Sequence, residues 1–241
     1  MIDVEARLGE AVRHYWRVRK RQHGQQGTKT GLKDAGTRGA VTGGKHADGL
    51  VRLIADTCRE AGVPHAHVHA IERSTRLLPG YFRPTKEWDL VVTSGNHLVG
   101  VMEVKSQVGS FGNNFNNRVE EALGNAADFW TAYSKGLFRL AQRPWLGYLF
   151  MLESTAKSIR PTRPVQLKHY AVDPVFQGLS YAKRYEQMCL RLVRERHYDA
   201  ACFFLSNEKD GLKGRFEEPN KEELGIVTFC RLLKARASAF T

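Results

Sequence analysis

The chain of 241 residues is long enough to bury one sizeable hydrophobic core, and we expect a single domain over residues 1–241. Its 37 lysines and arginines exceed its 25 aspartates and glutamates, and the resulting net charge of +12 is typical of proteins that bind nucleic acid. No apolar stretch approaches the roughly 20 residues of a membrane-spanning helix, and the N-terminus lacks a secretory segment, so we expect a soluble, cytoplasmic protein with no membrane partner.

The first expected element is an amphipathic helix near the N-terminus with a basic outer face. Its apolar face carries Val4, Leu8, Val12, Tyr15 and Val18. A stretch rich in glycine, glutamine, threonine and lysine follows over residues 22–49. We expect it to form a flexible basic arm or loop that contacts DNA, and the alternative is a mobile surface loop. Arg38 and Lys45 within it are candidate contacts to DNA phosphates or base edges.

A second helix and a histidine-rich strand are expected next. The helix is marked by Leu50, Leu53, Ile54, Cys58 and Ala61, and it ends at Gly62 and Pro64. His65, His67 and His69 would then lie on one side of an extended strand, where they could bind a transition metal or form an exposed strand edge. Glu72 follows as either an additional carboxylate of an acidic centre or the salt-bridge partner of a neighbouring arginine.

Residues 87–105 predict a β-hairpin, which is the centre of the functional prediction. Two short apolar strands flank a polar reversal at residues 94–97. Strand side chains alternate between faces, so one face should carry Val99, Val101, Glu103 and Lys105, and the other Gly100, Met102 and Val104. Pairing within the hairpin can bring Asp89, on the first strand, near Glu103 on the second.

These charged residues predict a nuclease. Asp89 and Glu103 supply carboxylate oxygens, which are the ligands that Mg²⁺ prefers, and a substrate phosphate would complete the coordination shell. Lys105 is placed to orient a water molecule or to stabilise the negative charge that develops on a phosphate. The predicted reaction is therefore Mg²⁺-dependent hydrolysis of a phosphodiester, and the alternative is a half-exposed hairpin with a surface salt bridge.

The pattern Asp89…Glu103-Val104-Lys105 resembles the Asp…Glu-x-Lys signature of the PD-(D/E)xK nuclease superfamily, although Trp88 stands where that superfamily often has proline. Residues 38–45, 87–92 and 103–114 further resemble the XhoI-type restriction endonucleases. The resemblance implies a restriction-endonuclease-like fold, a carbonyl ligand from Val104 beside the two carboxylates, and a homodimer that cuts both strands of the palindrome CTCGAG to leave 5′ overhangs. It also implies a companion DNA methyltransferase that acts on the same site without forming a stable complex.

A turn-rich linker is expected after the hairpin, over residues 109–117. Its asparagines could bond adenine in the major groove, or they could serve turns and helix starts. The candidate DNA contacts in this region are Gln107, Asn113, Asn114, Asn116 and Asn117. From Val119 the spacing predicts a long helix, with Glu120 and Glu121 in its first turns, where acidic residues are favourable.

Two nearly continuous apolar runs, residues 145–152 and 200–205, are typical of strands buried on both faces. Between them we expect an irregular basic loop at residues 153–170, which contacts DNA or a second subunit, and a helix at residues 181–196. A closing helix presents Ile226, Phe229, Cys230 and Leu233. Strands interleaved with helices predict the α/β class, as an α/β/α sandwich around a central mixed sheet.

The four cysteines are scattered without a Cys-x-x-Cys pair, so we expect reduced, buried thiols rather than a zinc site. The sequence as a whole favours a type II restriction endonuclease. Two alternatives stay open: a DNA repair or junction-resolving nuclease of the same superfamily, and a non-catalytic DNA-binding regulator. Structure-dependent cutting of branched DNA would indicate the former.

Overall fold

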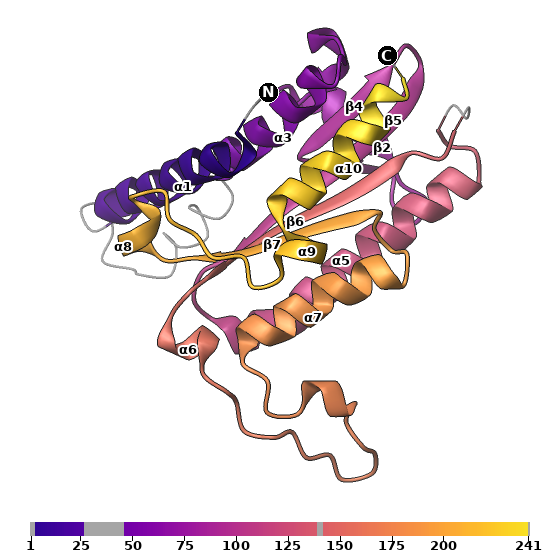
Figure 1. Cartoon of the computed structure of the whole chain (residues 1–241). Coiled ribbons are helices and arrows are strands. Elements are labelled where there is room, and N and C mark those ends of the chain that lie inside the picture. The colour runs from indigo at the N-terminus through magenta and orange to yellow at the C-terminus, as the bar shows by residue number, and fades with distance from the viewer. Residues whose placement is uncertain (1–2, 27–45, 139–141, 241) are drawn as a thin grey trace.

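A computed structural model describes residues 3–26, 46–138 and 142–240 (Figure 1). Its central sheet has five strands in the order β1-β4-β5-β6-β7. These strands are β1 (Val68–His69), β4 (Leu90–Ser94), β5 (His97–Gln107), β6 (Trp145–Glu153) and β7 (Ala200–Ser206). The first three pair antiparallel, whereas β5, β6 and β7 pair parallel. The sheet is therefore mixed, as the sequence predicted.

Helices cover both faces of this sheet (Figure 1). One face is covered by α1 (Val4–Gln26), α3 (Asp48–Glu60) and α10 (Ile226–Ser238), and the other by α5 (Phe111–Ser134) and α7 (Tyr181–Arg194). The buried side chains accordingly form two hydrophobic clusters, which we call the α1 cluster and the α5 cluster after the first helix of each. This layered arrangement confirms the predicted α/β sandwich.

Short elements connect the layers. β2 (Leu77–Pro79) and β3 (Thr85–Glu87) form a separate two-stranded antiparallel sheet. The short helices are α4 (Arg73–Arg76), α6 (Ala156–Ile159), α8 (Glu208–Gly211) and α9 (Lys221–Leu224), with 3₁₀ turns η1 (His65–His67) and η2 (Pro174–Phe176). Within the described ranges, no helix has the length and apolar character needed to cross a membrane.

β6 and β7 are the most deeply buried strands. Every residue of β7 is buried, and so is every residue of β6 except Glu153. Successive side chains of β6 alternate between the two clusters, with Leu149 in the α1 cluster and Tyr148 in the α5 cluster. Because helices cover both faces, both sets of positions must be apolar, which explains the continuous apolar run.

The prediction of buried, free cysteines is also confirmed.

A β-bulge in the β4–β5 hairpin changes the predicted alternation of side chains. The register shifts between Val92 and Thr93, so that Val99 on β5 is the extra residue. Val99 packs in the α1 cluster, whereas Val101 packs in the α5 cluster. The prediction that Val99 and Val101 share a face was therefore wrong, because the two-residue period restarts at the bulge.

The histidine segment is not one extended strand. Its first three residues form η1, and only two residues join the sheet, as edge strand β1. The prediction that three imidazoles share one strand face was wrong, since the N–H of His67 bonds to the carbonyl of Pro64 over 2.9 Å and closes a turn there. Nδ1 of His67 and Nε2 of His69 lie 3.2 and 3.1 Å from the hydroxyl of Thr93. The alternative of an edge strand is confirmed.

α5 begins at Phe111, well before the expected start near Val119. Ser110 adopts a left-handed conformation with φ of 45°, which turns the chain from β5 into the helix. Phe111 is buried, and Phe115 packs edge-to-face on Tyr185 of α7 with ring centroids 5.1 Å apart. The expected linker is thus largely helical, because these aromatic residues extend the apolar face of α5 toward its N-terminus. Glu120 and Glu121 consequently lie further along the helix than predicted.

The two expected loops have different boundaries in the structure. Residues 22–26 belong to α1 and residues 48–49 to α3, so both ends of the predicted arm are helical. Residues 27–45 lie outside the described residues. The other loop includes α6, whose capping box joins Thr155 and Ser158, and its irregular part continues to Leu179. Figure 1 shows this segment projecting from the body beside α7.

Candidate active site

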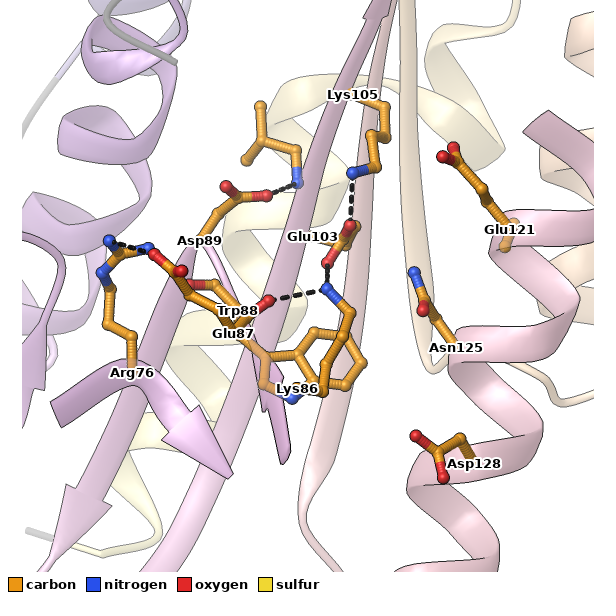
Figure 2. A network of polar contacts seen from close by, with 12 residues as sticks. Arg76, Lys86, Glu87, Trp88, Asp89, Glu103, Lys105, Glu121, Asn125 and Asp128 are labelled. Atoms are coloured by element: carbon orange, nitrogen blue, oxygen red, sulfur yellow. Dashed lines mark hydrogen bonds and ion pairs between the residues drawn. The ribbon is translucent and has the colours of Figure 1, made fainter. Parts of the chain in front are cut away.

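The β4–β5 hairpin brings Asp89, Glu103 and Lys105 together (Figure 2). Asp89 immediately precedes β4, and its N–H donates to the carbonyl of Met102 on β5 over 3.2 Å. Oδ2 of Asp89 accepts a hydrogen bond from the N–H of Val104 at 2.7 Å. These two bonds hold the Asp89 carboxylate against β5, beside Glu103.

Glu103 carries a buried carboxylate between two lysines. The residue is 1% exposed, and Nζ of Lys105 lies 2.6 Å from its Oε1, while Nζ of Lys86 lies 2.9 Å from its Oε2 (Figure 2). Burial opposes ionisation, but the two ammonium groups more than offset it and lower the pKa of Glu103 below its ordinary value. Glu103 is therefore an ionised carboxylate inside the fold.

Lys105 is held as a cation by its acidic neighbours. Burial alone would lower the pKa of Lys105, but the contact with Glu103 and the charge of Asp89 raise it above its ordinary value. A permanently charged ammonium can donate hydrogen bonds and stabilise negative charge, whereas a general base must be neutral. The geometry consequently suits Lys105 to electrostatic stabilisation.

Asp89 differs from Glu103, because its surroundings disfavour the ionised carboxylate. Burial, followed by the charge of Glu103, raises the pKa of Asp89 from 3.8 to about 6, although the hydrogen bond from Val104 acts in the other direction. A divalent cation between the two carboxylates would favour their ionised forms and offset their repulsion. Among the described residues, no group of three or more His, Cys, Asp or Glu side chains forms a complete protein cage. The two carboxylates thus fit a divalent cation that keeps water or phosphate oxygens in its shell.

A cleft of about 560 Å³ opens beside Asp89. It is lined in part by residues of α3, α4 and β3, and the charged residues among these are Asp48, Arg52, Asp56, Arg59, Arg76 and Glu87. Arg76 donates to Oε1 of Glu87 over 2.7 Å, and Arg73 donates to Oε2 over 2.9 Å. The Asp89 carboxylate is thus reached from a cleft whose lining combines charged and apolar side chains.

Lys86 is the main feature of the site that sequence reasoning missed. Its ammonium contacts Glu103, donates to the carbonyl of Glu87 at 2.7 Å and lies 4.6 Å from the centre of the Trp88 ring. Trp88 is 2% exposed and packs edge-to-face against Phe129 of α5. Side-chain alternation along residues 86–88 places Lys86 and Trp88 on one face. The β2–β3 sheet, which positions Lys86 beside Glu103, had no clear signal in the sequence.

The structure pairs Glu72 with a neighbouring serine. Glu72 is exposed, precedes α4 and accepts a hydrogen bond from the hydroxyl of Ser74. The arginines expected as its partners, Arg73 and Arg76, pair instead with Glu87. Glu87 lines the cleft beside Asp89, and a role for Glu72 as an additional carboxylate stays a prediction.

The candidate DNA contacts fall into three structural groups. Gln107 is buried at the end of β5, where its amide donates to the carbonyl of Gly109 at 2.7 Å and its oxygen accepts from Arg118 at 3.4 Å. The asparagines lie on the first turns of α5, where Asn113, Asn116 and Asn117 are exposed and Asn114 is half-buried. Arg38 and Lys45 lie outside the described residues, and a DNA-contacting role for all of these residues stays a prediction.

Comparison with known proteins gives consistent matches over most of the chain. The family model described as "Restriction endonuclease XhoI" matches residues 25–218. The type II restriction enzyme BstVI of Geobacillus stearothermophilus is 45% identical over 203 residues, which cover 82% of this chain and 89% of that protein. XhoI of Xanthomonas vasicola is 45% identical over 159 residues, covering 66% of this chain and 64% of that protein, and AbrI of Azospirillum brasilense is 43% identical over 159 residues, covering 66% and 70%.

No solved structure shows a significant match to the chain. The family model nevertheless spans more than half of the chain, and it includes the whole β4–β5 hairpin with its acidic pair and lysine. The chain belongs to the XhoI restriction endonuclease family and is a type II, site-specific deoxyribonuclease.

Proposed function

We propose that this enzyme uses Mg²⁺ to cleave both strands of duplex DNA at the palindrome CTCGAG, leaving 5′ overhangs with 5′-phosphate and 3′-hydroxyl ends. The observation that carries the proposal is the convergence of Asp89, Glu103 and Lys105 on one hairpin, with a cleft beside Asp89. Membership of the XhoI family supports the choice of sequence. The net charge of +12 is suited to a polyanionic substrate.

Asp89 and Glu103 would hold the cation through their carboxylate oxygens, together with the carbonyl of Val104. When bound, Mg²⁺ supplies Lewis acidity at the scissile phosphate and its attacking water. The hydrogen bond between Val104 and Asp89 fixes one carboxylate against the backbone of β5, and the short contact with Lys105 fixes the other. The protein thereby orients both acidic ligands before the substrate arrives.

Lys105 would assist the chemical step as a cation. Its ammonium, held beside Glu103, can donate a hydrogen bond to the attacking water and stabilise negative charge on the phosphate oxygens. Attack in line with the departing oxygen breaks the bond between phosphorus and the 3′ oxygen, so the phosphate stays on the 5′ end. Asp89 and Glu103 keep their ligand role throughout.

A palindromic target calls for a symmetric enzyme. Two protomers related by a two-fold axis can place one catalytic hairpin on each strand, so that protein symmetry matches site symmetry. We therefore propose a homodimer on DNA, with a companion methyltransferase that modifies the same sequence as a separate protein. Sedimentation of the enzyme with a CTCGAG duplex should show two protomers for each duplex, and a strictly monomeric complex would contradict this arrangement.

Digestion of long duplex DNA tests the proposed reaction. With Mg²⁺ the enzyme should give discrete fragments, and sequencing of their ends should place every cut at CTCGAG, whereas EDTA should abolish cutting. Glu103→Gln and Lys105→Ala should lose cleavage while retaining sequence-specific binding in a gel-shift assay. Discrete ends at another sequence would refute the specificity, and undiminished cleavage by either variant would refute the assignment of the site.

A further inference from the structure

Lys86 occupies an unusual position for a lysine. Its side chain is only 14% exposed, and its ammonium lies between the Glu103 carboxylate, the carbonyl of Glu87 and the face of the Trp88 ring (Figure 2). Enclosing a lysine in this way costs side-chain entropy and hydration, which charged partners must offset. A largely enclosed lysine at a nuclease site therefore calls for a specific explanation.

The two lysines together engage both oxygens of Glu103. Lys105 contacts Oε1 and Lys86 contacts Oε2, so each carboxylate oxygen already has one ammonium partner. A cation that binds Glu103 must approach one of these oxygens and would meet a positive charge there. Each oxygen keeps a further lone pair, but a divalent cation bound there would lie close to an ammonium group and be repelled by it. Movement of one ammonium away from Glu103 would remove this repulsion.

Of the two lysines, Lys86 can move away from Glu103 more easily. Lys105 projects from the same strand as Glu103 and is also attracted by Asp89 and Glu121. Lys86 comes from β3, and its two other contacts, with Glu87 and Trp88, belong to its own segment and do not depend on Glu103. A carbonyl oxygen and an aromatic face can stabilise an ammonium group after it has left a carboxylate.

We propose that Lys86 is the internal counter-ion of the metal site: its ammonium neutralises Glu103 in the metal-free enzyme and is displaced from Oε2 by the incoming divalent cation. The inference rests on the proposed metal site at Asp89 and Glu103. Lys86 acts through Glu103 and is a positioning residue, because it keeps the buried carboxylate ordered and ready to bind. The cation's affinity then includes the free energy needed to displace Lys86.

Metal affinity tests the proposal independently of cleavage. Mn²⁺ binding to the full chain is measured from the electron paramagnetic resonance signal of free Mn²⁺, for the wild type and for Lys86→Met, which removes the charge but keeps most of the side chain. The variant should bind Mn²⁺ at least roughly threefold more tightly, because the competing ammonium is gone. Unchanged or weaker binding by a folded Lys86→Met protein would overturn the proposal.

Lys183→Met is a matched control. Lys183 lies 2.7 Å from Oε2 of the buried residue Glu186 on α7, so it forms a lysine–carboxylate pair away from the hairpin, although its side chain is 53% exposed. Its replacement should leave Mn²⁺ affinity unchanged. Glu103→Gln tests the metal site separately from the role of Lys86. Loss of Mn²⁺ binding in this variant would support the metal site at Asp89 and Glu103, whereas unchanged binding would refute that site and, with it, the role of Lys86.

A second measurement uses the wild-type chain and does not depend on the folding of a variant. Lysines are acetylated briefly with N-hydroxysuccinimide acetate, with and without saturating Mn²⁺, and labelling at each lysine is quantified by mass spectrometry. Labelling of Lys86 should rise severalfold with Mn²⁺, since its ammonium leaves Glu103, whereas labelling of Lys183 should stay constant. Equal labelling of Lys86 in both conditions would show that it is not displaced.

Discussion

Replacing Asp89 by asparagine should make the metal-free enzyme more stable at neutral pH, although it removes a proposed metal ligand. In the folded chain, burial and the charge of Glu103 raise the pKa of Asp89 from 3.8 to about 6. The ionised form is therefore unfavourable in the folded state relative to the unfolded state. Asparagine carries no charge, and its side-chain oxygen can still accept the hydrogen bond from Val104.

The pKa difference sets the size of this effect. A change from 3.8 to about 6 corresponds, at about 1.4 kcal/mol for each tenfold change in proton affinity, to roughly 3 kcal/mol. Because the folded chain binds the proton more tightly, the contribution of Asp89 to stability is lost as pH rises from about 4 to about 6. The stability gain of Asp89→Asn should therefore approach 3 kcal/mol above pH 6 and vanish below about pH 4.

Urea denaturation in EDTA, at about pH 4 and about pH 7, measures this difference. Asp173→Asn is a suitable control, because Asp173 is exposed and Arg191 lowers rather than raises its pKa, so the variant should gain no stability at neutral pH. Addition of Mg²⁺ should stabilise the wild type but not Asp89→Asn. If Asp89→Asn is no more stable than the wild type near pH 7, or if its advantage persists unchanged in acid, the reasoning is refuted.

Two further predictions concern the stability of the fold. Asp128 is buried and accepts hydrogen bonds from the N–H groups of Tyr81 and Phe82. Asp128→Ala should lower the free energy of unfolding by about 2–4 kcal/mol in urea denaturation and accelerate hydrogen exchange at those two amides. Unchanged exchange would contradict this. A Cβ on Gly211 would lie 2.0 Å from Cδ1 of Trp16, so Gly211→Ala should destabilise the fold by about 1–3 kcal/mol. Gly124→Ala, whose Cβ would meet open space, should be neutral or stabilising. Equal unfolding free energies for the two variants would contradict this.

Local periodicity accounts for most of what could be predicted. The short apolar runs that form β6 and β7 are typical of strands covered on both sides, and their length favours a strand over a buried helix. The helical spacing around Cys58 and Tyr185 identified α3 and α7 for a similar reason, since one face of each helix contacts the sheet. These patterns were sufficient for the fold class.

The errors occurred where a few residues changed the local geometry. The bulge at Val99 reversed the side-chain alternation over part of β5, and the turn after Pro64 interrupted the histidine strand. The spacing of Phe111, Phe115 and Val119 could have shown that α5 starts early, but glycine and asparagine between them favour turns. Packing of the two aromatic rings against α7 outweighed that preference.

The sequence by itself determined that Glu103 and Lys105 lie on one face of a strand, because the period of two is a property of the backbone. It also placed Asp89 next to Glu103 through the hairpin, although Asp89 immediately precedes β4 and does not lie on the strand itself. Only the tertiary structure decided that Lys86 reaches Glu103, since β3 belongs to a different sheet and its side-chain alternation does not show how the two residues between β3 and β4 turn the chain. The burial of Glu103 and the raised pKa of Asp89 are likewise tertiary properties, because both depend on the helices and strands that exclude water from the hairpin.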